Sequence, residues 1–428
     1  PCHVADVSGR RQRDRKKEGR RPTTRGTPLL PGNSKKGPFQ ELIEHQPPLT
    51  VQQLRARRVE LIKEIQHLRR RPLVIYATNA SINQPRVPAM IHREDLALLS
   101  EILDSVSGNE LDFLIETPGG LSEVTVEIVN LLRPRFDHVA FIVPQMAMSA
   151  GTILVMSGDE ILMDHRSSLG AIDPQFLSSD GRVQPAQAIL AGIETIKQDV
   201  AKNGGNLNPV YLPILRNVDP GKLQSAINAS ALSMELVANW LAQFKFRNWT
   251  THASTGGPVT ADERRERAAE IAASLCDHQK WLSHGRPIKI ADLEAMHLKI
   301  TDYGKTPDLQ AHIWSLWINL SHSMSSTNIY KCYESEHVEF FKMALQQPAA
   351  MPTPAADNAG KAVVDVQCNK CGTAHKIQAS FGAPQALDPG AMAFPKDCML
   401  KCRSCGSVLN LTGLKLQLEA QLRRPILL

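Results

Sequence analysis

Short apolar runs alternate with amphipathic segments along the first part of the chain. Each apolar run has the length of a buried strand, and each is preceded by a segment with leucine or isoleucine at helical spacing. Strands separated by helices of about 10–15 residues indicate crossover units and a mainly parallel sheet. The predicted strands are 73–76, 111–115, 139–143 and 160–163, and the predicted helices are 51–71, 93–106, 121–132 and 149–157.

The rest of the chain is mostly helical until a linker rich in proline and alanine. Helices are predicted over 184–246 (with a break near 206–213), 261–282 and 307–332, and short strands over 363–366 and 407–411. These patterns divide the chain into a tail, a main domain, a linker, a cysteine-bearing module and a second tail. The predicted boundaries are 1–47, 48–345, 346–361, 362–413 and 414–428.

Composition and charge narrow the class of protein. Hydrophobic residues make up 42% of the chain and charged residues 21%, as in soluble globular proteins. No apolar run approaches the roughly 20 residues of a spanning helix, so we expect no transmembrane segment. Residues 1–40 hold eleven Lys or Arg and three acidic residues, so this stretch carries a net charge of +8, the whole chain +6 and the remaining chain −2. Such a tail is usually a disordered arm, and contact with nucleic acid is the less favoured alternative.

Two short motifs follow predicted strands and open predicted helices. In Thr117-Pro118-Gly119-Gly120 the glycines permit a sharp turn with outward N–H groups, which an oxyanion needs, although many such turns have no further role. Ser149 lies among small residues at the start of 149–157, where a substrate backbone can approach it and the helix dipole favours negative charge. Ser149 is therefore a candidate nucleophile, with a simple helix cap as the alternative.

Asp173 follows the last of these strands and is flanked by Ile172 and Pro174. A fixed carboxylate of this kind orients the histidine in triad chemistry, and a turn aspartate is the alternative.

Together these stretches resemble the serine dehydrogenase proteinase family, within the superfamily of Clp protease and signal peptide peptidase A that shares the crotonase fold. The resemblance covers roughly residues 50–335. It is carried by Thr117-Pro-Gly-Gly120, Ala147-Met-Ser149-Ala-Gly151, Leu169-Gly-Ala-Ile-Asp173-Pro-Gln175 and Ser283-His284-Gly285-Arg286-Pro287-Ile288.

The resemblance implies an α/β fold, a ClpP/crotonase-like spiral of β-β-α units with added helices. It also implies a serine peptidase with a triad in the order Ser, Asp, His. Carried over, Ser149 is the nucleophile, Asp173 the orienting acid and His284 the general base. The oxyanion hole is assigned to Gly119, Gly120 and Ala150. His278 and His297 lie near His284 in sequence, His165 is an alternative base, and Lys197 (or Lys202) would serve in a lysine scheme like that of signal-peptide-peptidase-type relatives.

Two Cys-x-x-Cys-Gly motifs lie late in the chain. Cys368, Cys371, Cys402 and Cys405 have the spacing of a closed structural zinc site, so we expect a small zinc ribbon with bound Zn²⁺. Cys398 and His375 are competing ligands. Paired cysteines of this kind favour a reducing compartment, which we take to be the cytoplasm.

The sequence thus predicts a cytoplasmic serine peptidase that acts on a peptide or protein and assembles as a homo-oligomer, as superfamily members commonly do. A crotonase-fold acyl-processing enzyme and a non-catalytic adaptor that binds through the basic tail and the ribbon remain alternatives. No Gly-x-x-x-x-Gly-Lys-Ser/Thr loop is present, so we do not expect ATP hydrolysis by this chain.

Overall fold

The computed structural model describes residues 36–81, 87–177, 183–252, 255–344, 360–422 and 424–427. It divides into two compact units, 1–49 and 50–428. In the first unit the described residues include one short helix, α1 (Pro38–Glu44), within the segment predicted as a tail. The basic stretch 1–35 and almost all of the predicted linker 346–361 lie outside the described residues.

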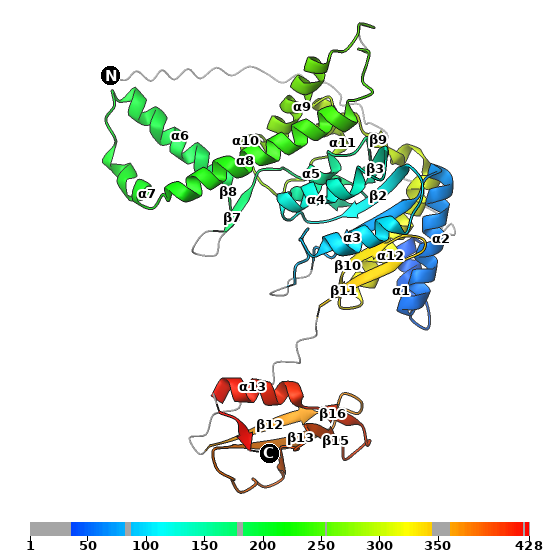
Figure 1. Ribbon diagram of the computed structural model, residues 1–428, viewed down its shortest axis with the longest axis vertical. Helices are drawn as coiled ribbons and strands as arrows, with labels where there is room; N and C mark the ends of the chain where they lie inside the picture. The colour runs from blue at the N-terminus through cyan, green and yellow to red at the C-terminus, as the bar shows by residue number, and fades with distance from the viewer. Residues whose placement is uncertain are drawn as a thin grey trace, which may run out of the picture. The chain divides into compact units, whose positions relative to one another are not determined.

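A seven-stranded sheet forms the centre of the second unit (Figure 1), in the order β11-β10-β1-β2-β3-β5-β9. Strands β1, β2, β3, β5 and β9 run parallel to one another, as the crossover pattern predicts. Strand β10 pairs antiparallel with both of its neighbours, β1 and β11. The strands are β1 (Leu73–Thr78), β2 (Glu110–Glu116), β3 (His138–Ile142), β5 (Glu160–Met163), β9 (Thr301–Asp302), β10 (Ile329–Glu334) and β11 (Glu339–Met343).

The prediction of a helix over 307–332 is wrong in its last part. Helix α12 (Pro307–Ser325) ends at Ser325, and the next residues enter strand β10. The hydroxyls of Ser325 and Ser326 both donate to the carbonyl of His322, which offers the backbone an alternative to further helical turns. Strand β10 is completely buried and rich in aromatic and β-branched residues, so pairing with β1 outweighs the helical pattern.

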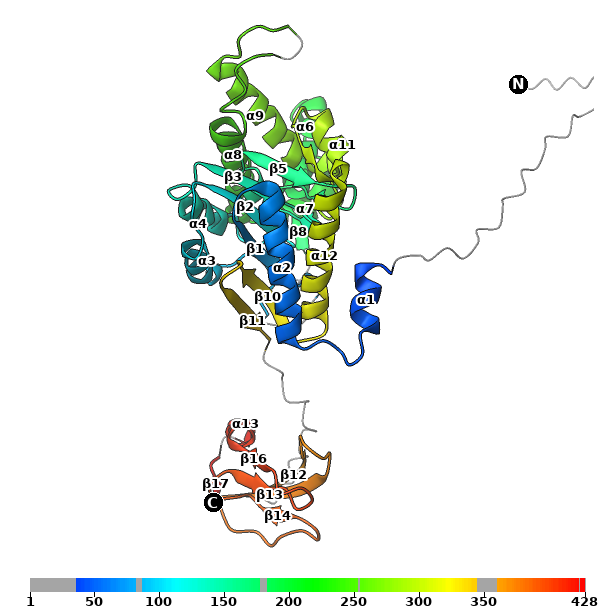
Figure 2. The same ribbon diagram turned by 90° about the vertical axis from the view of Figure 1, so that its right-hand side faces the viewer.

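The period of two along each strand divides the core between the two faces of the sheet. In β1, Val74 and Tyr76 pack on one face, whereas Leu73 and Ile75 pack on the other. Helices α2 (Val51–Arg69) and α12 lie side by side over the second face (Figure 2). The first face is covered by α3 (Asp95–Asp104), α4 (Ser122–Leu132) and α5 (Ala150–Val155), with parts of α8 (Pro220–Trp240) and α9 (Ala261–Cys276).

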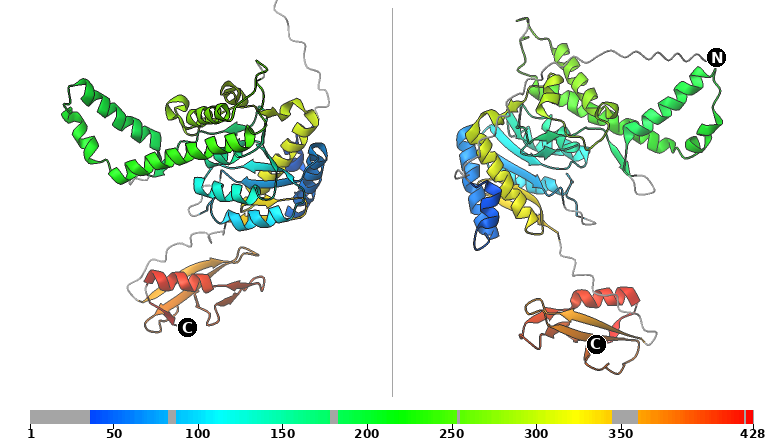
Figure 3. Two further views of the ribbon diagram at one scale, coloured as in Figure 1. Left: turned by 45° about the horizontal axis from the view of Figure 1, so that its top comes forward. Right: turned by 180° about the vertical axis from the view of Figure 1, so that it is seen from behind.

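A helical arm interrupts this layered body. Figure 3 shows it extending away from the sheet, with α6 packed along α8. Ala186 and Ile196 are the buried side chains of α6, and the C-terminal end of α8 enters the core through Val237 and Trp240. The arm consists of β7 (Gln175–Leu177), β8 (Val183–Pro185), α6 (Ala186–Lys202), a 3₁₀ turn η1 (Pro209–Tyr211), α7 (Leu212–Arg216) and α8 (Pro220–Trp240).

After the arm, the chain returns to the body through short elements. The predicted helix 261–282 is divided into α9 (Ala261–Cys276) and α10 (His278–Trp281), because Asp277 caps the start of α10. The remaining elements of the body are a π-helical turn η2 (Leu241–Lys245), α11 (Ile290–Ala295), a 3₁₀ turn η3 (Tyr303–Lys305) and the paired strands β4 (Met146–Ala147) and β6 (Ser168–Leu169). Within the described ranges, no helix combines the length and the apolar character needed to cross a membrane.

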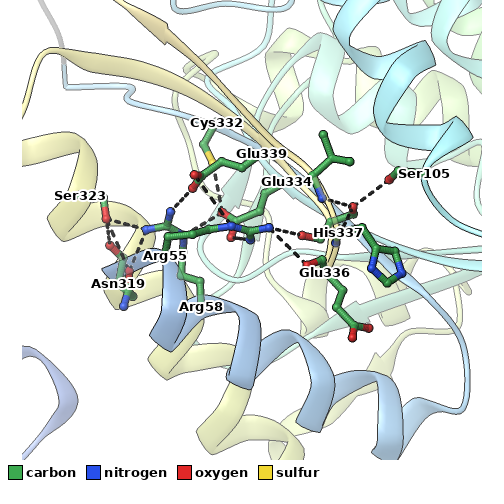
Figure 4. Close-up of polar contacts among 12 residues, drawn as sticks. Arg55, Arg58, Ser105, Asn319, Ser323, Cys332, Glu334, Glu336, His337 and Glu339 are labelled. Carbon is green, nitrogen blue, oxygen red and sulfur yellow. Dashed lines mark hydrogen bonds and ion pairs between the residues drawn. The ribbon is translucent and has the colours of Figure 1, made fainter. Parts of the chain in front are cut away.

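A buried ionic cluster joins α2 and α12 to the antiparallel strands (Figure 4). Arg58 is fully buried, and its Nε donates to Glu334 Oε2 at 2.7 Å. Its Nη1 donates to Asn319 and Ser323 of α12, and its Nη2 pairs with Glu339 of β11. Every polar group of this guanidinium thus has a partner from another element, as a buried charge requires.

The C-terminal module has its own hydrophobic core and two small sheets. The strands expected at 363–366 and 407–411 are present as β12 and β16. The segment predicted as a tail, 414–428, contains most of α13 and also β17, which pairs with β13. The elements are β12 (Lys361–Gln367), β13 (Ala374–Phe381), β14 (Met392–Ala393), β15 (Met399–Lys401), β16 (Val408–Asn410), α13 (Thr412–Leu422) and β17 (Ile426–Leu427).

Candidate functional site

Ser149 lies at a sharp bend between β4 and α5. Its backbone has φ 52° and ψ −117°, which is rare for a residue with a side chain and costs about 1–3 kcal/mol. The serine stands at the N-cap position, yet its side chain makes no capping hydrogen bond. A strained strand–turn–helix bend of this kind is a known way to present a serine hydroxyl to a substrate.

The turn at Gly119 and Gly120 packs directly against Ser149. Both glycines have positive φ, 111° and 148°. A Cβ atom on Gly119 would lie 2.8 Å from both the carbonyl oxygen of Met148 and the Cβ of Ser149, so a side chain at this position would collide with the bend. Glycine is therefore required at 119 by close approach as well as by backbone conformation.

The backbone N–H groups around Ser149 differ in whether they have a hydrogen-bond acceptor. The N–H of Gly119 donates to Thr117 Oγ1 at 3.2 Å. Ile91 pairs with the turn by donating to the carbonyl of Gly119 and accepting from the N–H of Leu121, which bypasses Gly120. The N–H groups of Gly120 and Ala150 have no acceptor among the residues that the structure describes. They are the available donors beside the serine.

Asp173 is completely buried and lies between two histidines. His284 Nδ1 is 2.7 Å from Asp173 Oδ1, and His278 Nδ1 is 3.1 Å from Asp173 Oδ2. Gln175 also donates to Oδ2 through its side-chain amide, at 3.1 Å. The predicted Asp173–His284 contact is therefore present in the structure, and His278 shares the same carboxylate.

Two backbone connections bring the histidines to Asp173. Leu169 and Ile288 form an antiparallel bridge through two hydrogen bonds of 3.0 and 2.8 Å. The N–H of Ile172 donates to the carbonyl of Leu275 at the end of α9. Lys289 reinforces the first connection, because its ammonium group donates to the carbonyls of the turn at 165–167 and to Ser168 Oγ.

The alternative bases lie elsewhere in the structure. Lys197 is on the outer surface of α6, its side chain is 70% exposed, and it pairs with Glu194 at 3.0 Å. His165 is 72% exposed and lies 3.8 Å from Asp164. Neither side chain contacts Asp173.

Glu116 is a buried carboxyl group that the sequence analysis does not single out. It is the last residue of β2, directly before the Thr117–Gly120 turn, and it is 4% exposed. Its Oε2 accepts the N–H groups of Gln145 and Met146 at 3.2 and 3.0 Å. Burial without a cationic partner raises the pKa of Glu116 to about 8. The available signal in the sequence was an acidic residue directly after the apolar run Phe113-Leu114-Ile115.

The four predicted cysteine ligands gather at one point of the C-terminal module. Their sulfur atoms all lie within 4.8 Å of one another, and the Cys368–Cys405 and Cys371–Cys402 pairs are 3.6 Å apart. Such spacing fits tetrahedral coordination of one ion by four thiolates. His375 Nε2 lies 3.3 Å from Cys402 Sγ, as an outer hydrogen-bond partner would. Cys398, the other competing ligand, is outside this cluster.

Cys332, Glu334 and Glu339 form a second close group of metal-ligating residues. Figure 4 shows that the guanidinium groups of Arg55 and Arg58 already contact both carboxylates. Because these cations neutralise the group, we interpret it as part of the ionic cluster.

Comparison with known proteins supports the sequence resemblance. A sequence model of the family described as ClpP-like SDH-type serine proteinase matches residues 40–204. Two uncharacterized proteins of Methanocaldococcus jannaschii are similar to this chain. One is 30% identical over 159 residues, which are 36% of this chain and 54% of the relative. The other is 33% identical over 108 residues, which are 21% of this chain and 37% of the relative. The chain thus spans about half or less of these relatives.

Among solved structures, the 1510-N membrane-bound stomatin-specific protease is 22% identical and covers 27% of this chain and 61% of its own, with a TM-score of 0.21. ClpP1 from Listeria monocytogenes is 12% identical and covers 57% of this chain and 96% of its own, with a TM-score of 0.27.

The family assignment rests on the sequence match. The matched segment contains the Thr117–Gly120 turn, Ser149 and Asp173, whereas His284 and the cysteine module lie beyond it. Residues 40–204 of this chain thus match the family of ClpP-like SDH-type serine proteinases, and the predicted resemblance is confirmed.

Proposed function

We propose that this protein is a serine peptidase that hydrolyses peptide bonds through an acyl-enzyme on Ser149. The observation that carries the proposal is the contact of 2.7 Å between His284 Nδ1 and the buried Asp173 carboxylate. A buried carboxylate bound to Nδ1 fixes the imidazole so that Nε2 can accept a proton. Ser149, strained and without a capping bond, is the nucleophile that such a base would serve.

In the first step, the base takes the proton of the Ser149 hydroxyl while Oγ attacks the scissile carbonyl carbon. The resulting oxyanion is held by the N–H groups of Gly120 and Ala150, and Gly119 keeps the turn close to the serine. The base then gives the proton to the leaving amine as the carbon–nitrogen bond breaks. Water hydrolyses the ester by the same route and restores Ser149.

His284 is our choice for the base because its contact with Asp173 is the shorter one. His278 is the competing assignment, since it holds the other oxygen of the same carboxylate. A lysine base at Lys197 is disfavoured by its exposed position on α6 and its pairing with Glu194.

We assign a structural role to the metal site of the C-terminal module. Zn²⁺ suits four thiolates, and four protein ligands leave no open position for substrate. When bound, the ion would hold the two Cys-x-x-Cys-Gly turns together. Native mass spectrometry should show one zinc per chain, and Cys402→Ser should lose it. A full-length chain without zinc after purification in zinc-containing buffer would contradict this assignment.

We further propose a peptide or protein substrate and a homo-oligomer. The arm supports self-association because it exposes apolar side chains that a monomer leaves in water. Val210 is 71% exposed, Ile214 53% and Ile227 44%. Multi-angle light scattering on the wild type and on a Val210→Asp/Ile214→Asp variant tests this. The cysteines in the described part of the chain are unpaired thiols, which supports the cytoplasm as the compartment.

The decisive experiment is labelling with a fluorophosphonate probe, with Ser149→Ala compared against the wild type. Labelling that disappears with Ser149→Ala, while Ser157→Ala keeps it, identifies an activated nucleophile. Equal absence of labelling in folded, zinc-loaded wild type and variant would reject the peptidase and favour the adaptor. Labelling at Ser149 with hydrolysis of acyl thioesters but not of peptides would favour an acyl-processing enzyme.

A further inference from the structure

We propose that Glu116 is a positioning residue, whose carboxylate holds the Gln145–Met146 segment and thereby sets Ser149 against the oxyanion turn. The inference rests on the proposed function, because it assigns Glu116 a role in the reaction of Ser149. It concerns a residue that touches neither the substrate nor the reacting atoms.

Glu116 belongs to a set of hydrogen bonds that link the end of β2 to the segment before Ser149. Its side chain binds the N–H groups of Gln145 and Met146, which stand four and three residues before Ser149. The next residue, Thr117, continues the connection through its backbone. Its N–H donates to the carbonyl of Met146, and its carbonyl accepts from Met148, both at 3.0 Å. The end of β2 and the approach to Ser149 are thus joined by four hydrogen bonds.

The groups that face the Glu116 carboxylate are N–H groups and not cations. The indole N–H of Trp317 on α12 also faces Glu116 and lowers its pKa, so the carboxyl group lies among N–H groups from two other segments. Within the described residues, no lysine, arginine or histidine pairs with it. Two charged groups lie further along this path. Arg166 lies over the ring of Trp314, which stacks on Trp317, and it pairs with Asp164 at 2.7 Å.

Because Glu116 is bound by N–H donors and not by a cation, the strength of its hydrogen bonds depends on its protonation state. The ionised carboxylate accepts from the N–H groups of Gln145 and Met146, and charged acceptors form stronger hydrogen bonds than neutral ones. A protonated carboxyl group is only a neutral acceptor, so these contacts become weaker. Because burial raises the pKa of Glu116 to about 8, the change falls in a range of pH where the protein can be assayed. Ser149 should therefore become more reactive as Glu116 loses its proton.

The test is the second-order rate constant of fluorophosphonate labelling between pH 7 and 9, where an ordinary histidine is already neutral. The wild type should gain about tenfold over this range, and Glu116→Gln, which mimics the neutral group, should stay near the wild-type value at pH 7. Glu127→Gln, an exposed carboxylate of α4, is the matched control and should follow the wild type. Trp317→Phe removes one donor and should shift the rise to higher pH.

A second readout does not depend on catalysis. Above pH 8, where the wild-type carboxylate is ionised, amide hydrogen exchange at Gln145 and Met146, corrected for intrinsic rates, should be about tenfold faster or more in Glu116→Gln, since hydrogen bonds to a charged acceptor are stronger than those to a neutral one. Equal protection and an unchanged pH profile in the variant would overturn the proposal. If the wild type is not labelled at all, the peptidase proposal fails, and the exchange rates still decide whether Glu116 holds the segment. If Glu116→Gln does not fold, Trp317→Phe carries the test.

Discussion

Glu116 and Glu334 are both buried carboxylates of one sheet, but their surroundings are opposite. Glu334 lies on β10 and contacts the guanidinium groups of Arg55 and Arg58. Glu116 ends β2 and faces only N–H donors, two from the backbone and one from an indole. The same chemical group is thus neutralised by charge in one place and held by dipoles in the other.

The difference separates a structural role from a functional one. A carboxylate between two arginines fixes the packing of helices on the sheet. The carboxyl group of Glu116 has no cation beside it and a raised pKa, and it lies next to the turn and the bend that hold the proposed oxyanion donors and the proposed nucleophile. Perturbed acidic groups gather at functional sites for this reason. The predictions below test whether the two groups really behave differently.

The largest effect on stability is expected at the ionic cluster. Arg58→Ala leaves the Glu334 carboxylate buried with one cation fewer, and we expect a loss of about 3–5 kcal/mol in the free energy of unfolding. Urea denaturation measures it. The matched control is Lys63→Ala on the same helix, whose partner Glu60 is exposed, with an expected loss of less than about 1 kcal/mol. Equal losses in the two variants would remove the distinction between buried and exposed pairs.

Glu116 should make stability depend on pH in a particular direction. Its pKa is raised to about 8 in the folded protein from an ordinary value near 4.5, so its contribution is present at low pH and is lost as pH rises through 8. Between pH 5 and 8 the wild type should lose up to about 4 kcal/mol relative to Glu116→Gln. Urea denaturation of both proteins at pH 5, 6.5 and 8 measures this. A difference that is independent of pH would contradict the uncompensated burial of this group.

The carboxylate of Asp173 is intermediate between those of Glu334 and Glu116, since it faces histidines rather than arginines. His284→Gln should reduce the labelling rate of Ser149 by about 10²-fold or more, as expected for loss of a general base. His278→Gln should reduce it less, about tenfold at most, if His278 only orients Asp173. A larger loss in His278→Gln than in His284→Gln would exchange the two roles.

The smallest effect is expected far from any buried carboxylate. Lys197→Ala removes a cation on the surface of α6, and the labelling rate should change by less than about twofold. An inactive Lys197→Ala together with a nearly normal His284→Gln would replace the triad by a lysine base.

Much of the fold follows from the sequence because local patterns determine it. The apolar runs at 73–76 and 111–115 predict buried strands, and the spacing of the cysteines predicts the metal site. Strand β10 was missed because its pairing with β1 depends on residues far away in the chain. Local periodicity alone extends α12 through that segment.

The site could be predicted only where motif and resemblance coincide. Asp173 and His284 follow from the family resemblance, and the structure brings them into contact. The second histidine on Asp173 and the donors around Glu116 could not be predicted. They arise from loops that meet only after α9, α10 and α12 have packed on the sheet.

The bridge between Leu169 and Ile288 joins two segments that leave the ribosome at different times during synthesis. Asp173 and His284 are 111 residues apart in the sequence, and the long arm lies between them. A ribosome-bound chain that has exposed Ser149 and Asp173 still lacks the imidazole of His284, so it carries the proposed nucleophile without its proposed base. Under the proposed function, activity would appear only after the segment around His284 has left the ribosome, and a nascent chain would be protected from cleavage by its own incomplete site.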